Sequence, residues 1–306
     1  MPSSPLALLR NLLYGMLMGG ADVIPGVSGG TMALIVGIYE RLVGAISSAV
    51  SFGLALLRAD ADGMRTHWAA IPWGLVLPLV VGIGGAIALG AHIIPGLLEA
   101  YPEQMRGLFL GLVGASLLIP ALRIERLTLP RGLVGGACAV AAFYLTGLPA
   151  LDEASAPGLI RVFLSAAVAI CAMILPGVSG AFLLKALGIY EPTLQAIKTM
   201  LALDPAALPY VLTFGGGAVA GLGAFAKLLD WLLTHRHDAT MAALVGLIAG
   251  ALRSLWPYVT PDRSLHLPNA GDPVGSVVGL TLLGFAAVLG LLWWGRRAEP
   301  AAASTG

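Results

Sequence analysis

Residues 24–40 read IPGVSGGTMALIVGIYE, and residues 175–191 read LPGVSGAFLLKALGIYE. The two stretches align without a gap at an offset of 151 residues in a chain of 306, and nine of the 17 aligned positions are identical. Each stretch carries a Pro-Gly pair within an apolar segment, and proline breaks a helix because it lacks a backbone N–H group. The duplication therefore predicts two similar broken helices, one in each half of the chain.

The composition places this chain in a membrane. Hydrophobic residues make up 58% of it and charged residues 11%, and the mean hydropathy is +0.90. Soluble domains carry about 25% charged residues, so this chain has too little charge to coat a soluble surface. The net charge of +1 excludes a basic surface for nucleic acid. Because no metal-ligand spacing and no nucleotide-binding fingerprint occurs, we expect no metal and no other cofactor.

Six segments are long and apolar enough to be ordinary transmembrane spans, which need about 20 residues each. They cover residues 73–95, 106–121, 132–148, 209–234, 240–257 and 274–295. Two further regions, 6–57 and 159–200, each hold two apolar arms around a Pro-Gly break. We interpret both regions as re-entrant hairpins, because arms of about 15–20 residues are marginal spans. A pair of full spans would fit the loop charges equally well.

The loop charges assign the two faces of the membrane. Basic loops stay in the cytoplasm, and here they contain Arg58, Arg65, Arg123, Arg126, Arg131, Arg236, Arg296 and Arg297. Acidic residues mark the other face: Glu99, Glu103, Asp152, Glu153, Asp204, Asp262 and Asp272. This threading puts both termini in the cytoplasm.

The same threading divides the chain into two halves, residues 1–150 and 151–306, each with one hairpin and three spans. Because three is odd, the second half is inserted upside down relative to the first. The sequence thus predicts an all-α polytopic membrane protein with an inverted-topology repeat, an architecture found among secondary transporters.

The two breaks form the predicted substrate-binding site. A helix that restarts after a break directs free N–H groups and the positive end of its dipole at an anion such as phosphate. Ser28 and Ser179 stand where the N-caps of the restarted helices belong. The predicted site consists of Pro25, Gly26, Val27, Ser28, Gly29 and Gly30 together with Pro176, Gly177, Val178, Ser179 and Gly180. The alternative is that each break is merely a packing kink.

Cations inside apolar segments are costly and usually functional. Three are candidate ligands of the phosphate: Lys185, Lys227 and Arg253. Lys227 can instead pair with Asp230, three residues further along the same helix face, and Arg253 can extend to the membrane surface.

Carboxylates near the hairpins are candidates for coupling or for structure. Asp22 precedes the first break, where it either exchanges protons or braces the hairpin. Glu40 and Glu191 end the two Gly-Ile-Tyr-Glu copies, and there we expect hydrogen bonds at the hairpin base, with Arg41 as a local partner of Glu40.

The segment from Asp22 to Arg41, DVIPGVSGGTMALIVGIYER, resembles the signature of the bacterial polyprenyl-phosphate transporter family. The resemblance covers essentially the whole chain, because the second PGVSG falls where that family has it. It implies a flippase in the bacterial inner membrane that returns undecaprenyl phosphate from the outer to the cytoplasmic leaflet for cell-envelope synthesis. The implied partners are the polyprenyl phosphate lipid and the bilayer, with a proton as a candidate coupling ion. Tail length and oligomeric state are not implied.

Two other functions are compatible with these residues. A small-anion channel or secondary transporter can use the same loops, because helix N-termini also bind chloride or free phosphate. Residues 26–30, Gly-Val-Ser-Gly-Gly, also match the G-x-S-x-G nucleophile elbow of serine hydrolases. A hydrolase would need a histidine near that serine, and His92 is the only histidine within an apolar span.

Overall fold

The computed structural model describes residues 4–22, 28–147, 157–175, 180–260 and 264–303, and the regular elements in these ranges are helices. The first half contains α1 (Pro5–Asp22), α2 (Gly29–Ile35), α3 (Tyr39–Leu57), α4 (Ala61–Ala70), α5 (Trp73–Ala100), α6 (Pro102–Ser116), α7 (Leu118–Leu122) and α8 (Leu129–Gly147). The second half contains α9 (Leu159–Ile174), α10 (Gly180–Ala186), α11 (Tyr190–Leu201), α12 (Leu208–His235), α13 (His237–Ala251) and α14 (Val274–Ala303). Two short 3-10 turns, η1 (Pro205–Ala207) and η2 (Leu252–Leu255), complete it.

Within the described ranges, five helices are long and apolar enough to cross a membrane, or six if α4 and α5, bent by 69° at their junction, form one span. All six predicted spans coincide with a helix or helix pair: α5, α6 with α7, α8, α12, α13 and α14. Of these, α14 is counted only as a shorter apolar helix, over Val274–Gly290, whereas α3, which the sequence places in a hairpin, is long enough to span. The all-helical membrane class is therefore confirmed.

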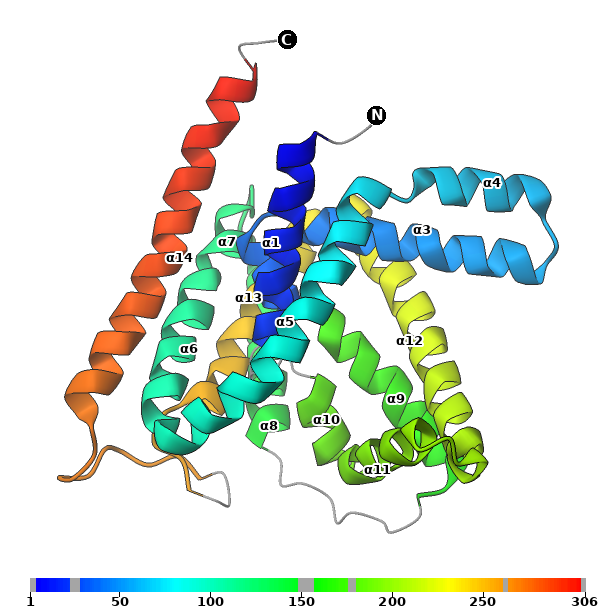
Figure 1. Cartoon of the computed structure of the whole chain (residues 1–306). Coiled ribbons are helices and arrows are strands. Elements are labelled where there is room, and N and C mark those ends of the chain that lie inside the picture. The colour runs from blue at the N-terminus through cyan, green and yellow to red at the C-terminus, as the bar shows by residue number, and fades with distance from the viewer. Residues whose placement is uncertain (1–3, 23–27, 148–156, 176–179, 261–263, 304–306) are drawn as a thin grey trace.

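Four helix pairs make up most of the packing: α1 with α5, α9 with α12, α8 with α13, and α6 with α14 (Figure 1). Glycine allows each pair to approach closely. A Cβ atom added at Gly82 of α5 would collide with the carbonyl of Leu12, and one added at Gly217 of α12 would collide with the carbonyl of Phe163. Such small-residue contacts are the usual means of helix association in lipid, where no hydrophobic force drives helices together.

The second arm of each hairpin is interrupted by a turn and is not one continuous helix. The short α2 ends at Gly37, whose φ of +76° suits glycine, and Ile38 N–H donates to Ala33 O at 2.9 Å. The short α10 ends in the same way at Gly188 (φ +66°), where Ile189 N–H donates to Leu184 O at 3.0 Å. These bonds define a Schellman-type helix end. The repeated Gly-Ile-Tyr-Glu sequence therefore stops one helix and starts the next.

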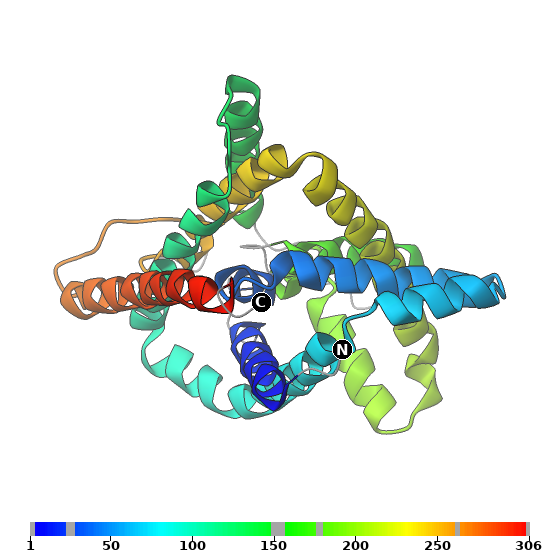
Figure 2. The same ribbon diagram turned by 90° about the horizontal axis from the view of Figure 1, so that it is seen from above.

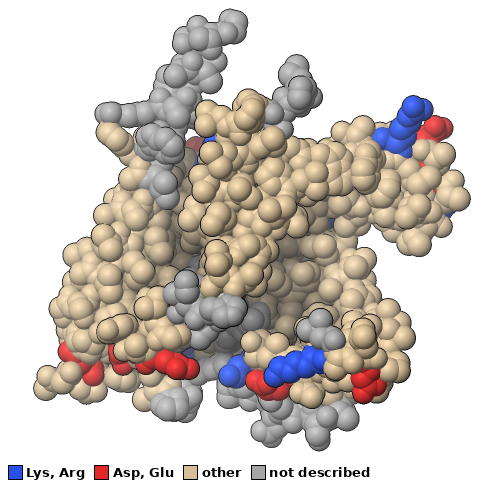
Figure 3. Space-filling model, viewed as in Figure 1, with Lys and Arg blue, Asp and Glu red and all other residues tan. Residues whose placement is uncertain are grey.

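The helix that follows the first of these turns, α3, packs against α12, where Gly223 faces Val50, and its far end projects together with α4. In Figure 1, α3 and α4 lie side by side across the direction of the long helices, at the end where α1 begins and α14 finishes. Figure 2 shows this pair, in blue, projecting outward from the other helices. In Figure 3 acidic side chains, with several lysine or arginine side chains among them, line the opposite end, and a wide band with few charged side chains separates the two ends. Such a band is what a lipid-facing surface requires.

The tight α8–α13 contact can be tested with a pair of glycine substitutions. A Cβ at Gly246 of α13 would collide with the carbonyl of Gly135, whereas a Cβ at Gly136 of α8 meets no atom within 4 Å. We expect Gly246→Ala to destabilise the protein by about 1–3 kcal/mol, the usual cost of overpacking. Gly136→Ala should be neutral or stabilising, since alanine favours helix. Melting temperatures in detergent would measure both; equal stability of the two variants would contradict this packing.

Candidate functional site

The structure describes part of the predicted substrate site. The residues at the two breaks that it covers are Ser28, Gly29, Gly30 and Gly180, with Asp22 before the first break. The remaining predicted residues lie outside the described ranges: Pro25, Gly26, Val27, Pro176, Gly177, Val178 and Ser179.

Ser28 joins the two hairpins. It is the N-cap of α2, with an extended backbone, and its Oγ accepts the Gly30 N–H at 3.1 Å. The hydroxyl also faces the last turn of α9, 3.3 Å from the Met173 carbonyl and 3.5 Å from the Leu175 carbonyl, to which it can donate. The N-cap prediction for Ser28 is thus confirmed. Through this 2% exposed side chain, the start of α2 is attached to the helix that leads into the second break.

The two glycines after Ser28 permit close contact with neighbouring oxygen atoms. Gly29 N–H donates to the Asp22 carboxylate at 2.7 Å. This hydrogen bond joins the end of α1 to the start of α2 across the first break. A Cβ at Gly30 would lie 2.7 Å from the Ile174 carbonyl, so only glycine fits beside α9 without movement.

These contacts use the N–H groups that the sequence predicts to be free. The N–H groups of Gly29 and Gly30 bond to side chains, and that of Thr31 donates to Ser28 O at 2.9 Å. A phosphate at this position would therefore have to replace the Asp22 carboxylate.

The three candidate cations lie on different elements. Lys185 is in the last turn of α10, with an exposed side chain, where its charge also complements the C-terminal end of the helix dipole. Lys227 is exposed on α12. Arg253, in η2, places its guanidinium carbon 4.6 Å from the centre of the Phe143 ring and Nη1 3.5 Å from the Phe143 carbonyl, so it caps the end of α8. None of the hydrogen bonds of Ser28 or Asp22 in the described ranges involves these cations.

The predicted partner of Glu40 is wrong. Glu40 Oε1 lies 2.7 Å from Nη1 of Arg123, at the end of α7, rather than pairing with the adjacent Arg41. Because consecutive residues on a helix point in different directions, Arg41 faces away and is exposed. Glu191, the equivalent carboxylate of the second hairpin, is also exposed.

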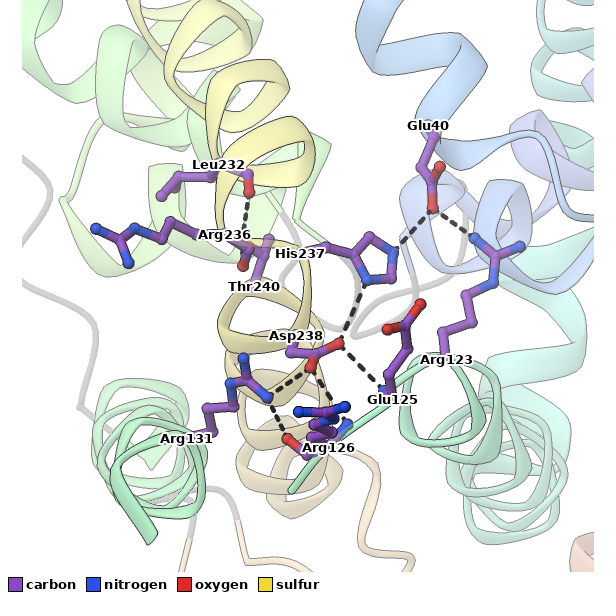
Figure 4. A network of polar contacts seen from close by, with 10 residues as sticks. All are labelled: Glu40, Arg123, Glu125, Arg126, Arg131, Leu232, Arg236, His237, Asp238 and Thr240. Atoms are coloured by element: carbon purple, nitrogen blue, oxygen red, sulfur yellow. Dashed lines mark hydrogen bonds and ion pairs between the residues drawn. The ribbon is translucent and has the colours of Figure 1, made fainter. Parts of the chain in front are cut away.

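A polar network that sequence reasoning missed lies near this ion pair (Figure 4). Its centre is Asp238, in the first turn of α13, which accepts the backbone N–H groups of Glu125 and Arg126 at 3.1 and 3.3 Å. Arg131 of α8 adds an ion pair with Asp238 at 2.6 Å.

The imidazole of His237 links the two parts of the network. It lies 3.8 Å from the Glu40 carboxylate and 3.7 Å from that of Asp238. The network therefore connects the base of the first hairpin, the α7–α8 loop and the α12–α13 junction.

A second missed residue fixes the base of the other hairpin. Arg161 of α9 donates from Nη2 to the Leu187 carbonyl at 2.6 Å, next to the Gly188 turn. The repeat offers one indication of this residue, because Arg10 lies 151 residues before Arg161, at the equivalent position of the first half.

The arrangement at Ser28 does not resemble a hydrolase site. The hydroxyl is engaged with the Gly30 N–H and with α9 carbonyls, and no histidine is among its described hydrogen-bond partners. A serine nucleophile needs a base within hydrogen-bond reach. Ser28 is a structural cap.

Membrane-length helices around broken helices that meet through polar contacts define a polytopic membrane protein of the transporter class. Residues 18–269 match the family described as VCA0040-like, undecaprenyl phosphate translocase-like. The chain belongs to this family, and it is accordingly a transporter and not an enzyme.

Two relatives cover most of the chain. A polyprenyl-phosphate transporter of Vibrio cholerae is 38% identical over 275 residues, which span 90% of this chain and 85% of the relative. A polyprenyl-phosphate transporter of Staphylococcus aureus is 30% identical over 284 residues, 89% of this chain and 95% of the relative. No solved structure matches.

The role of Asp22 at the break can be tested by two substitutions. Asp22→Ala leaves the Gly29 N–H without its partner, and an unpaired buried donor is costly, so the melting temperature should fall by several degrees. Asp22→Asn keeps a carbonyl oxygen as acceptor and should recover part of that loss. If Asp22→Ala melts like the wild type, Asp22 does not close the break.

Proposed function

We propose that this protein is a flippase that returns polyprenyl phosphate, such as undecaprenyl phosphate, from the outer to the cytoplasmic leaflet of the bacterial inner membrane for cell-envelope synthesis. The observation that carries the proposal is the contact of Ser28 with the end of α9, which brings the two broken hairpins together within the membrane. The names of the two relatives support a polyprenyl phosphate substrate.

In this proposal the phosphate binds where the two hairpins meet, at residues 25–30 and 176–180. The N–H groups of Gly29 and Gly30 are the nearest described donors, and they now bind the Asp22 carboxylate and the Ser28 hydroxyl. The Asp22 carboxylate at this position supports the proposal that an anion binds there, and a phosphate carries more charge and more acceptor oxygens. The prenyl tail remains in the lipid while the head group crosses.

Proton coupling follows from the same exchange of anions. A protonated Asp22 is a weaker acceptor for the Gly29 N–H than the carboxylate is, and its release leaves that donor to the phosphate. In this scheme a proton and the lipid head group enter the site together, and Asp22 resumes its bond after release.

The proposal includes an inverted-topology repeat of residues 1–150 and 151–306. Several contacts recur at equivalent positions and support it, beginning with the Gly37 and Gly188 turns, 151 residues apart. Gly111 of α6 faces the carbonyl of Thr281 on α14 in the way that Gly246 of α13 faces the carbonyl of Gly135 on α8. The face at which α1 begins and α14 ends would be cytoplasmic, since most of the arginines lie near it.

Reconstitution into liposomes tests the proposed substrate. Labelled polyprenyl phosphate should cross protein-containing liposomes faster than empty ones, whereas chloride and inorganic phosphate should not. Ser28→Ala should slow this transport only in part, since a neutral hydrogen bond contributes about 0.5–1.5 kcal/mol. Passage of the soluble anions without the lipid would instead establish a small-anion transporter or channel.

Lys185 is the cation by which the two halves differ most, since Leu34 occupies its position in the first half. If it neutralises the phosphate during transport, Lys185→Ala should lose most transport and Lys185→Arg should keep a measurable part, because arginine retains the charge. Lys198, in the last turn of α11, offers a matched control, and Lys198→Ala should transport normally. Normal transport by Lys185→Ala would leave Lys185 only its role at the end of α10.

A further inference from the structure

A second polar site is present beside the Asp238 network. A cavity of about 510 Å³ lies between the start of α8, the end of α12 and the start of α13. Its basic lining residues are Arg131, Arg236, His235 and His237, and its acidic ones are Glu125 and Asp238.

The charged side chains that line this cavity differ in how far partners within the protein neutralise them. Asp238 is occupied by Arg131 and by two backbone N–H groups, so its negative charge is largely neutralised inside the protein. Arg236 has an exposed side chain, and the ion pairs within the described ranges do not include it. In Figure 4 its guanidinium points away from the Asp238 network. The Arg131 pair with Asp238 engages Nη1, which leaves further guanidinium N–H groups.

Exposed apolar side chains lie in and beside the cavity. Val134 lines it from α8 and is 41% exposed. On α12, Trp231 is 50% exposed and stacks on His235 with 5.2 Å between ring centres. An exposed tryptophan at a helix end is typical of the membrane–water boundary. A ligand that fits both parts has an anionic head and an apolar tail.

We propose that this cavity binds the phosphate monoester head group of a polyprenyl lipid at the membrane face at which α1 begins and α14 ends. Arginines in pockets between transmembrane helices at such a face bind anionic lipid head groups. The lining here holds two arginines and two carboxylates, of which Asp238 is already paired with Arg131, so the attraction comes from Arg236 and not from a net positive lining. Arg236 supplies the planar fork that matches phosphate oxygens. A monoester fits better than a diester because it carries up to two charges. The choice of lipid rests on the proposed function, in which this site receives the head group after it has crossed.

A cysteine reporter tests the site separately from the hairpin junction. Thr128 lines the cavity and is exposed, so Thr128→Cys, in a chain with Cys138→Ala and Cys171→Ala, can be labelled with a maleimide. The probe is farnesyl phosphate, a short polyprenyl monophosphate, added to the full chain in detergent. We expect it to slow labelling at position 128.

Arg236 variants assign the protection to the proposed ligand. Arg236→Ala should raise the half-protecting concentration about tenfold, the effect of one charge-assisted hydrogen bond, and Arg236→Lys should raise it less. The matched control is Arg58→Ala, an exposed arginine after α3 that is not among the residues lining the cavity. Size-exclusion profiles would show that each variant is folded.

Several outcomes would overturn the inference. They are protection independent of Arg236, equal protection by inorganic phosphate at the same concentration, and equal protection by phosphatidylglycerol. Liposome transport without protection at position 128 would refute this site and leave the proposed function standing. Protection without transport of polyprenyl phosphate would refute the proposed function and leave a lipid phosphate site.

Discussion

Backbone groups exposed by a broken helix must find partners inside a membrane, because lipid offers none. The chain breaks twice after apolar helices, before α2 and before α10, and at the first break the described contacts show how the groups are satisfied. Asp22 binds the Gly29 N–H, and Ser28 binds the Gly30 N–H while its hydroxyl faces carbonyls of α9. The surrounding helices follow from this need, since they enclose the breaks and approach one another through glycine. A polar junction made in this way is also suited to hold and release an anion.

An internal carboxylate lies at each of the two sites proposed for the phosphate, the hairpin junction and the α8–α12–α13 cavity. Asp22 holds a helix-start N–H group at the junction, and Asp238 holds two loop N–H groups and Arg131 beside the α8–α12–α13 cavity. The two carboxylates differ in the number of donors that hold them. Asp238 is held by several donors and stays fixed, so Arg236 remains available to bind a ligand. Asp22 has one described backbone donor and is easier to displace. This difference suits a fixed receiving site and a central site whose anion must exchange.

Much of the fold could be predicted because its signals are local. A span is an apolar run of set length, so α5, α8, α12, α13 and α14 follow from hydropathy, and the N-cap role of Ser28 follows from its position after Pro-Gly. The ends of α2 and α10 also have a local signal, the glycine of Gly-Ile-Tyr-Glu, which suits a helix end. The Asp238 network had no such signal. Its members join the α7–α8 loop to the α12–α13 junction across 113 residues, and only packing sets that proximity. The charged residues of the loops predicted the membrane face on which each loop lies, but not which of them form ion pairs.

The central claim is that the lipid phosphate binds where the two broken hairpins meet. A polyprenyl phosphate with a photoreactive diazirine on the first isoprene unit would report its position in the full chain within liposomes. The account predicts adducts on peptides that contain residues 22–30 and 173–180, reduced by an excess of unlabelled lipid and by Ser28→Ala. Adducts confined to α5 and α14, unchanged by competing lipid, would contradict it.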